Sequence, residues 1–388
     1  MNRFKASALL AALLSTPMFA QAAAATDQLQ QEIDTLKKQN KTIMERMDAS
    51  MDMMESKKSG GGHGGQGKTT IGGYGELHLN NLSGEGGAAD KKEIDFHRFV
   101  MFFGHEFSKD IRFFSELELE HSIAGDGKAG EIELEQGYLE FDISKNMRAK
   151  GGLFLVPVGI INETHEPNTF YGTERNPIEK NIIPATWWEA GAALNGKFSE
   201  GMSYDVALTS GLDLSGSNNK IRDGRRKVAS APASSPMMTG RIKYTGVPGL
   251  ELATTVANIS DYTQGQGTKN AATMIEAHAV YNTGAFGLRA LYASWDVNGK
   301  TTGYDKQAGW YLEPSYKISP KLGAFARYNK YDNQAGTGGP GNSEKTQTDI
   351  GLNYWPHEDV VIKVDYQTQN NANKENQNGL NIGMGYQF

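Results

Sequence analysis

The chain has 388 residues, no cysteine, 46 glycines and a formal net charge of −6 at neutral pH. The lack of cysteine excludes disulfides, thiolate metal sites and cysteine nucleophiles, and the acidic balance argues against nucleic acid as a partner. Abundant glycine together with 16 tyrosines and 16 phenylalanines is typical of many strands joined by tight turns.

The first segment, residues 1–22, has the pattern of a secretory signal peptide. Arg3 and Lys5 precede an apolar stretch that runs to Phe19, and the small residues 20–22 suit a cleavage site. A membrane anchor is the alternative, but the apolar run is shorter than the ~20 residues that a membrane helix needs. We therefore expect a mature chain that is exported to the periplasm.

Residues 26–58 carry apolar residues at alternating steps of three and four, the heptad rhythm of a coiled coil. An isolated helix of this length is marginal in water, so the segment is predicted to oligomerise; a lone solvated helix or a disordered tether is the alternative. Residues 59–69 form a glycine-rich linker. The predicted seam positions of the coiled coil are Leu29, Ile33, Leu36, Asn40, Ile43 and Met47.

From residue 70 to residue 388 the apolar period changes to two, which indicates β-strands. Near the C-terminus, for example, Leu380 and Ile382 alternate with Asn381 and Gly383. The pattern divides into roughly sixteen strands of about ten residues, the length that a tilted membrane strand requires.

The connections between these strands are predicted to alternate between short and long. Residues 108–110 and 199–201 are short connections, whereas 80–93 and 157–186 are long ones. A membrane barrel with short periplasmic turns and long extracellular loops produces this alternation. The predicted fold is therefore all-β, a 16-stranded antiparallel transmembrane barrel preceded by a short coiled coil, with both barrel ends in the periplasm.

In hydrocarbon every backbone polar group must pair internally, so only a closed barrel can span the membrane with strands. One parity of each strand then faces lipid and the other faces a lumen that is wide enough to hold water. The charged residues predicted to line this pore wall are Arg98, Arg112, Glu116, Glu118, Glu189, Arg241, Lys243, Arg289, Arg327, Lys363 and Asp365.

Two stretches carry a family resemblance. The last residues, Gly383-Met384-Gly385-Tyr386-Gln387-Phe388, look like the terminal strand of bacterial outer-membrane proteins, which implies recognition of Phe388 by the assembly machinery. Residues 152–191, with Val156-Pro157-Val158-Gly159 and Trp187-Trp188-Glu189, are similar to the phosphate-selective porin O and P family. The resemblance implies a homotrimer in the outer membrane of a Gram-negative bacterium, with the coiled coil in the periplasm.

The predicted pore wall departs from the family in its charge. Phosphate-selective members are associated with basic pore linings, whereas here the basic residues compete with Glu116, Glu118 and Asp365. An acidic patch repels phosphate and concentrates cations. The name of the family therefore does not identify the solute of this chain.

The connection at about 157–186 is the longest, and a long structureless loop is usually functional. The porin resemblance implies that it folds into the lumen and narrows it, where charged side chains set ion preference. A solvated extracellular loop is the alternative. Its charged residues, the predicted constriction, are Glu163, His165, Glu166, Glu174, Arg175, Glu179 and Lys180.

These features predict a water-filled channel for passive diffusion of small hydrophilic solutes or ions, with outer-membrane lipids and further copies of the chain as partners. No cofactor is predicted, and no metal site, because His165-Glu166 lacks the spacing of helical metal ligands. A surface scaffold or adhesion barrel without transport is the alternative function. A hydrolase is least favoured, because neither G-x-S-x-G nor H-E-x-x-H occurs.

Overall fold

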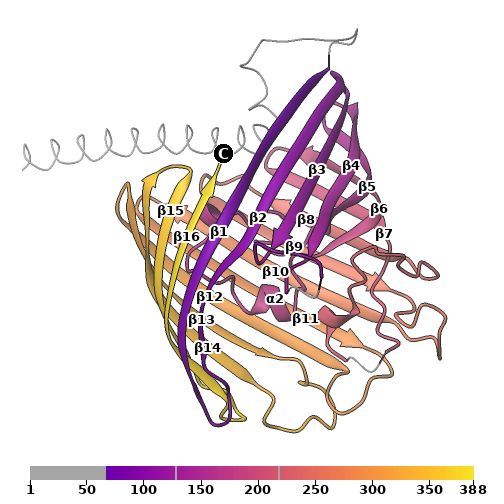
Figure 1. Ribbon diagram of the computed structural model, residues 1–388. Coiled ribbons are helices and arrows are strands. Elements are labelled where there is room, and N and C mark those ends of the chain that lie inside the picture. The colour runs from indigo at the N-terminus through magenta and orange to yellow at the C-terminus, as the bar shows by residue number, and fades with distance from the viewer. Residues whose placement is uncertain (1–66, 127–128, 217–218) are drawn as a thin grey trace, which may run out of the picture. The chain divides into compact units, whose positions relative to one another are not determined.

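The computed structural model describes residues 67–126, 129–216 and 219–388, which form a closed antiparallel barrel of sixteen strands (Figure 1). Each strand pairs with its neighbours in sequence, and the first strand closes the ring against the last. The strands are β1 (Lys68–Glu85), β2 (Lys91–Ser108), β3 (Ile111–Glu120), β4 (Ile132–Ser144), β5 (Met147–Leu155), β6 (Trp188–Ser199), β7 (Met202–Thr209), β8 (Met237–Tyr244), β9 (Leu250–Ile259), β10 (Ala272–Thr283), β11 (Phe286–Val297), β12 (Lys306–Ser319), β13 (Leu322–Asp332), β14 (Lys345–His357), β15 (Val360–Gln369) and β16 (Asn376–Gln387).

This ring confirms the predicted barrel and its strand number. The signal peptide at 1–22, the coiled coil at 26–58 and most of the linker at 59–69 lie outside the described residues. No helix among the described residues is long and apolar enough to cross a membrane.

The alternation of side chains along β15 shows which parity lies outside. Ile362, Val364 and Tyr366 are 43%, 37% and 55% exposed, whereas Lys363 and Asp365 are 2% and 3% exposed. Successive residues of a strand point to opposite faces of the sheet. The apolar residues of this strand therefore cover the outside of the ring, where a membrane would lie, and the charged residues point inside.

The short turns at one end of the barrel have a common local cause. In three of them a serine hydroxyl accepts a hydrogen bond from the backbone N–H two residues later, at 3.3 Å in each: Ser108 from Asp110, Ser144 from Asn146, and Ser319 from Lys321. Such local bonds replace ladder bonds and turn the chain.

The predicted long connection at 80–93 is wrong. β1 continues to Glu85 and β2 starts at Lys91, so the two strands are joined by a tight turn. The sequence conceals the extension because Asn80 and Asn81 interrupt the apolar alternation, yet they pair in the ladder with Glu93 and Lys92. Backbone pairing extends these strands beyond the clearly alternating segment.

An apolar core occupies part of the interior. Ile178, Ile182 and Ile183, in the connection between β5 and β6, pack with Met274 of β10 and Trp295 of β11. The connection between β7 and β8 also contributes to this core. The expectation that the inward parity of each strand faces a water-filled lumen is therefore wrong here, because the connections cover inward positions and shield them from water. The remaining core residues are Val156, Val158, Trp187, Leu212, Leu214, Ile221, Met237, Ala257, Ile259, Tyr262, Ala272, Leu291, Ala293, Val297 and Tyr311.

Candidate functional site

The connection from β5 to β6, residues 156–187, crosses the interior of the barrel, and we call it the inserted loop. Its short helix η1 (Pro167–Thr169) contacts β1, β15 and β16, and its helix α2 (Ile178–Asn181) contacts β12 and β13. Figure 1 shows α2 within the ring of strands. Ion pairs also join the inserted loop to β3, β4 and β8. Since β8 and β16 lie half a ring apart, the loop reaches opposite walls.

The two ends of the inserted loop are held together by Asn162, which is completely buried. Its Nδ2 donates to the carbonyl oxygens of Val156 at 2.8 Å and Trp187 at 3.0 Å, and its Oδ1 accepts from the Trp187 N–H at 2.7 Å. One amide side chain thus binds three backbone groups at the two ends of the loop, where the Val156 N–H also donates to the Trp187 carbonyl at 2.9 Å.

Glu179, predicted as a constriction residue, instead serves inside the inserted loop. Its Oε1 accepts the backbone N–H groups of Ile160 at 2.6 Å and Ile161 at 2.8 Å, while Oε2 accepts from Asn176 Nδ2 at 2.8 Å and the Tyr311 hydroxyl at 3.1 Å. Burial raises the pKa of the Glu179 carboxyl. The Glu179 side chain is wholly buried, and both of its carboxylate oxygens accept hydrogen bonds from the protein itself. The prediction that it lines the constriction is therefore corrected: it stabilises the inserted loop.

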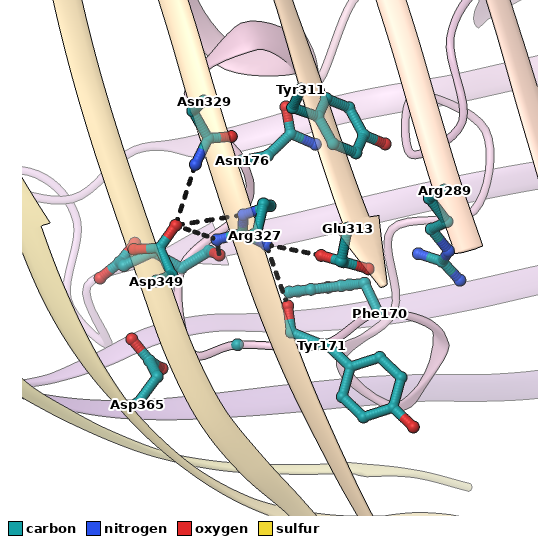
Figure 2. Close-up of polar contacts among 12 residues, drawn as sticks. Phe170, Tyr171, Asn176, Arg289, Tyr311, Glu313, Arg327, Asn329, Asp349 and Asp365 are labelled. Atoms are coloured by element: carbon teal, nitrogen blue, oxygen red, sulfur yellow. Dashed lines mark hydrogen bonds and ion pairs between the residues drawn. The ribbon is translucent and has the colours of Figure 1, made fainter. Parts of the chain in front are cut away.

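Arg327 of β13 connects the inserted loop to the neighbouring strands β12 and β14, as Figure 2 shows. Its guanidinium lies 3.1 Å from both Glu313 of β12 and Asp349 of β14. The same group donates to the carbonyl oxygens of Tyr171 at 3.2 Å and Glu174 at 3.3 Å. A buried arginine with two carboxylates and two carbonyls has its fork of donors well satisfied.

Neighbouring wall residues hold the same stretch of the inserted loop. Asp365 accepts the backbone N–H of Thr173 at 2.7 Å, and the ammonium of Lys363 lies 3.6 Å from the ring centre of Phe170. On β11, Arg289 donates to the carbonyl of Thr169 at 2.7 Å. These predicted wall residues therefore act at least partly as anchors of the loop.

Glu174 of the inserted loop binds the wall formed by β1 and β2. Its Oε1 lies 3.4 Å from His78 Nδ1 and 3.7 Å from Lys91 Nζ, and it accepts a hydrogen bond from Asn80 Nδ2 at 3.1 Å. Burial acts to raise the pKa of the Glu174 carboxyl, but His78 and Lys91 outweigh burial and hold the pKa well below its usual range.

The predicted residues on β2 and β3 lie beside this contact. Arg98 lies 3.5 Å from Glu76 and 3.6 Å from Glu118, and all three side chains are buried. Glu116 lies on the same face of β3 and is approached by His165 of the inserted loop at 3.3 Å.

A second set of ion pairs lines the interior toward the short turns. Arg241 binds Glu163 of the inserted loop and also Asp205 of β7, the latter at 2.8 Å. Lys243 lies 3.3 Å from Glu251. On the opposite side of β5, Arg112 binds Glu140 at 2.8 Å together with Asp142. Arg241 and Glu140 are buried, whereas the side chains of Glu163, Asp142 and Glu251 are 31%, 30% and 31% exposed.

Cations gather where the inserted loop meets the connection between β7 and β8. Arg222, in the short helix η2 (Ile221–Gly224), donates to the carbonyl of Ala185 at 2.6 Å, and Arg225 donates to the carbonyl of Pro184 at 3.0 Å. Burial lowers the pKa of Arg222, and the nearby Arg225 and Arg175 lower it further, against smaller opposing effects of Glu120 and Asp223. Arg225 also lies near Glu133 and Glu135, so carboxylates partly offset these cations.

The remaining predicted residues divide between these environments. Arg175 donates to the Thr186 hydroxyl at 2.8 Å, but its Nε and Nη2 are buried without a hydrogen-bond partner. Lys180 is exposed. Glu189 accepts from the Trp187 indole at 3.0 Å and from the Ser210 hydroxyl. Burial raises the pKa of Glu166.

Sequence reasoning missed several interior side chains that the structure brings to the inserted loop. Glu76, His78 and Asn80 share one face of β1, and Arg222 and Arg225 lie in a connection that showed no strand pattern. The first three could have been found, because they alternate with Gly75, Leu77 and Leu79 in the sequence. No local signal marks the two arginines.

Comparisons with known proteins agree with this architecture. The model of the family "Phosphate-selective porin O and P" matches residues 74–388. An uncharacterised protein of Aquifex aeolicus (strain VF5) is 29% identical over 354 residues, which cover 82% of this chain and 80% of that protein.

Solved structures of outer-membrane proteins share the fold. The outer membrane channel DcaP of Acinetobacter baumannii superposes with a TM-score of 0.58 at 13% identity, over 83% of this chain and 97% of that one. Salmonella typhi OmpF gives a TM-score of 0.57 at 13% identity, over 83% and 98% of the two chains. The family match over most of the sequence, together with the closed ring of sixteen strands, shows that this chain is an outer-membrane porin of the phosphate-selective porin O and P family.

Proposed function

We propose that this porin is a channel for passive diffusion of small hydrophilic solutes or ions, in which residues 157–186 form the constriction. The observation that carries the proposal is that this segment binds walls half a ring apart, through Glu163 with Arg241 on β8 and through its contacts with β16. A segment held on opposite walls reduces the free cross-section of the lumen. Charged groups at such a narrowing decide which ions pass.

We further propose that the constriction favours anions. Support comes from four cations near one another: Arg222 interacts electrostatically with Arg175 and Arg225, and Lys180 interacts with Arg222. Glu174 is offset by His78 and Lys91, so it adds little net negative charge. A positive constriction raises the local concentration of anions.

Assembly and targeting belong to the same proposal. OmpT of Vibrio cholerae, which shares the fold with a TM-score of 0.53 at 12% identity, is described in a trimer form. We propose a homotrimer for this chain as well, with residues 26–58 as a coiled coil in the periplasm. Phe388 is 55% exposed at the end of the barrel, which supports its recognition by the assembly machinery.

Planar lipid bilayers test conduction and selectivity together. The purified protein is expected to insert with discrete conductance steps and, in a KCl gradient, to give a reversal potential of the sign for anion preference. Arg175→Ala should shift the reversal potential toward cations and Glu174→Ala should shift it the opposite way. Lys109→Ala is the matched control, because Lys109 lies in a short turn with its side chain 89% exposed.

The competing functions predict other results. A surface scaffold or adhesion barrel would insert without conductance steps, and a hydrolase would need a catalytic set that these contacts do not supply. If neither Arg175→Ala nor Glu174→Ala changes the ion preference, the assignment of the constriction fails, even though the channel itself stands.

A further inference from the structure

One buried cluster between the inserted loop and the wall has no part in the proposed ion selection. It consists of His165 from the loop, Glu116 from β3 and Glu135 from β4. These residues are 3%, 1% and 2% exposed, so bulk water does not reach their polar atoms. Three potential ligands from three separate elements thus converge inside the barrel.

The atoms that face one another in this cluster are without hydrogen bonds. His165 Nε2 lies 3.3 Å from Glu116 Oε1 and 3.6 Å from Glu135 Oε2. All three atoms are buried and have no hydrogen-bond partner. A buried polar atom is normally paired, and one without a partner requires an explanation.

The other polar atoms of His165 and Glu116 are already engaged. His165 Nδ1 lies 3.2 Å from the carbonyl of Asn162, which accepts the Nδ1 proton, so Nε2 is the nitrogen that offers a lone pair once its own proton has been lost. Glu116 Oε2 accepts from Gln136 Nε2 at 2.7 Å. Metal-binding histidines and carboxylates are oriented by such outer contacts.

His278 provides a contrast within the same barrel. It also lies between two carboxylates, but its Nδ1 is 2.7 Å from Glu276 and its Nε2 is 3.2 Å from Glu251, both within hydrogen-bond distance. That histidine is satisfied by its two neighbours. The arrangement around His165 Nε2, in which neither carboxylate makes a hydrogen bond with that nitrogen, is therefore not what this fold produces wherever a histidine meets two glutamates.

The spacing suits a small cation. Two atoms that bind one Zn²⁺ at about 2.1 Å in tetrahedral geometry stand about 3.4 Å apart, close to the 3.3 Å and 3.6 Å of this cluster. Carboxylates also outnumber cations in the surroundings: Glu118 and Glu166 add to the two ligand carboxylates, against Arg98 and Arg175. Buried surplus negative charge is costly unless a cation compensates it.

We propose that His165, Glu116 and Glu135 bind one divalent transition-metal ion, with Zn²⁺ as the best-suited species. An imidazole nitrogen with two carboxylate oxygens is a ligand set for zinc and its first-row neighbours, whereas Mg²⁺ and Ca²⁺ select oxygen ligands alone. The bound ion joins the inserted loop to β3 and β4. The site binds metal whether or not the barrel conducts, so it goes beyond the proposed function.

A proton is the natural competitor of the metal. Burial acts to lower the pKa of His165, but Glu116 and Glu135 outweigh burial and the repulsion of Arg175 and raise the pKa to about 10. The metal must displace that proton, so its affinity falls as the pH falls. Besides these residues, the charged or titratable groups that face the site are Tyr74 on β1, Arg98 on β2, Glu118 on β3 and Glu166 in the loop.

The test is metal binding to the full-length protein in detergent after removal of bound ions with a chelator. A His97→Gln, His121→Gln background is used, because Asp95, His97 and His121 form another possible metal-binding group among the described residues. Co²⁺ is titrated by its ligand-field absorption and then displaced with Zn²⁺. We expect one equivalent of Co²⁺ per chain, with affinity that is higher at pH 8 than at pH 6.

Variants separate a metal ligand from a structural residue. His165→Gln and Glu135→Gln should weaken Co²⁺ binding at least tenfold, whereas His278→Gln should leave it unchanged. His165→Cys should restore binding and add a sulfur-to-cobalt charge-transfer band, which a packing role cannot produce. Gln136→Leu, which removes an outer contact, should weaken binding about tenfold.

The proposal is overturned if the background protein takes up no Co²⁺ at pH 8, or if His165→Gln and Glu135→Gln bind it as well as the background does. Heat-modifiable mobility in electrophoresis reports whether each variant has folded, and the His165→Cys result decides the case if Glu135→Gln does not fold. Since no conductance is measured, failure here leaves the proposed channel untouched.

Discussion

Single charged residues of the inserted loop have different tasks, and burial decides among them. Glu179 is buried completely and organises the loop, whereas Glu174 is paired with the wall and Arg175 has two nitrogens that are buried without a hydrogen-bond partner. All three looked equivalent in the sequence, because charge alone does not tell which side a loop residue faces. The partners of Glu174, such as Asn80, lie far away along the chain.

The ion pairs of the Glu174 carboxylate with His78 and Lys91 should persist in mild acid. Its carboxyl pKa is held well below the ordinary 4.5, so the contact is present above that value and is lost only as the pH falls through the lowered pKa. The difference in reversal potential between wild type and Glu174→Gln in a KCl gradient should therefore be nearly the same at pH 7 and pH 5. At both values Glu174→Gln should differ from wild type; a wild type that resembles this variant at pH 5 would contradict the assigned pairing.

At the scale of elements, the alternation of side chains along the strands could be predicted from the sequence. Which inward positions are apolar and covered by a loop could not. The period of two identified the strands because lipid and lumen impose opposite demands on neighbouring positions. Met274 and Trp295 face inward, yet they are apolar because α2 packs on them. A local pattern cannot distinguish an apolar residue covered by a loop from one covered by lipid.

This packing predicts how the inserted loop is held. Ile182→Ala should leave a cavity under the loop at a cost of about 2–5 kcal/mol, the usual range for a buried isoleucine. The barrel ladder is untouched, so the loop should fluctuate, and single-channel recordings should show greater current noise. Ile350→Ala, at an outward position on β14, is the control, and its current noise should match that of the wild type.

For the whole molecule, the ring of strands and the family followed from the sequence, whereas the arrangement of the interior did not. Short and long connections revealed the two ends of the barrel, although the first long connection proved to be a tight turn. The contacts that position the inserted loop join residues on strands from β1 to β15, and no sequence motif records them. Only the closed ring brings these partners together.

The predicted coiled coil leads to a separate prediction about assembly. Ile33→Asp with Leu36→Asp places charges in the seam and should disrupt helix association, because seam positions require apolar side chains. Native electrophoresis should then show fewer trimers, while each barrel still folds and conducts. Glu32→Lys, on the polar flank, is the control; equal trimer content in all three proteins would contradict the role of residues 26–58.

The seam between β1 and β16 has a consequence for biogenesis. The last residue, Phe388, exchanges backbone hydrogen bonds with Gly73 at 2.9 and 3.0 Å, so the ring closes only with the final residues of the chain. Until those residues arrive, two strand edges remain unsatisfied, and such edges invite pairing with other chains. A protein that has lost its last strand would therefore be an aggregation hazard rather than a smaller pore.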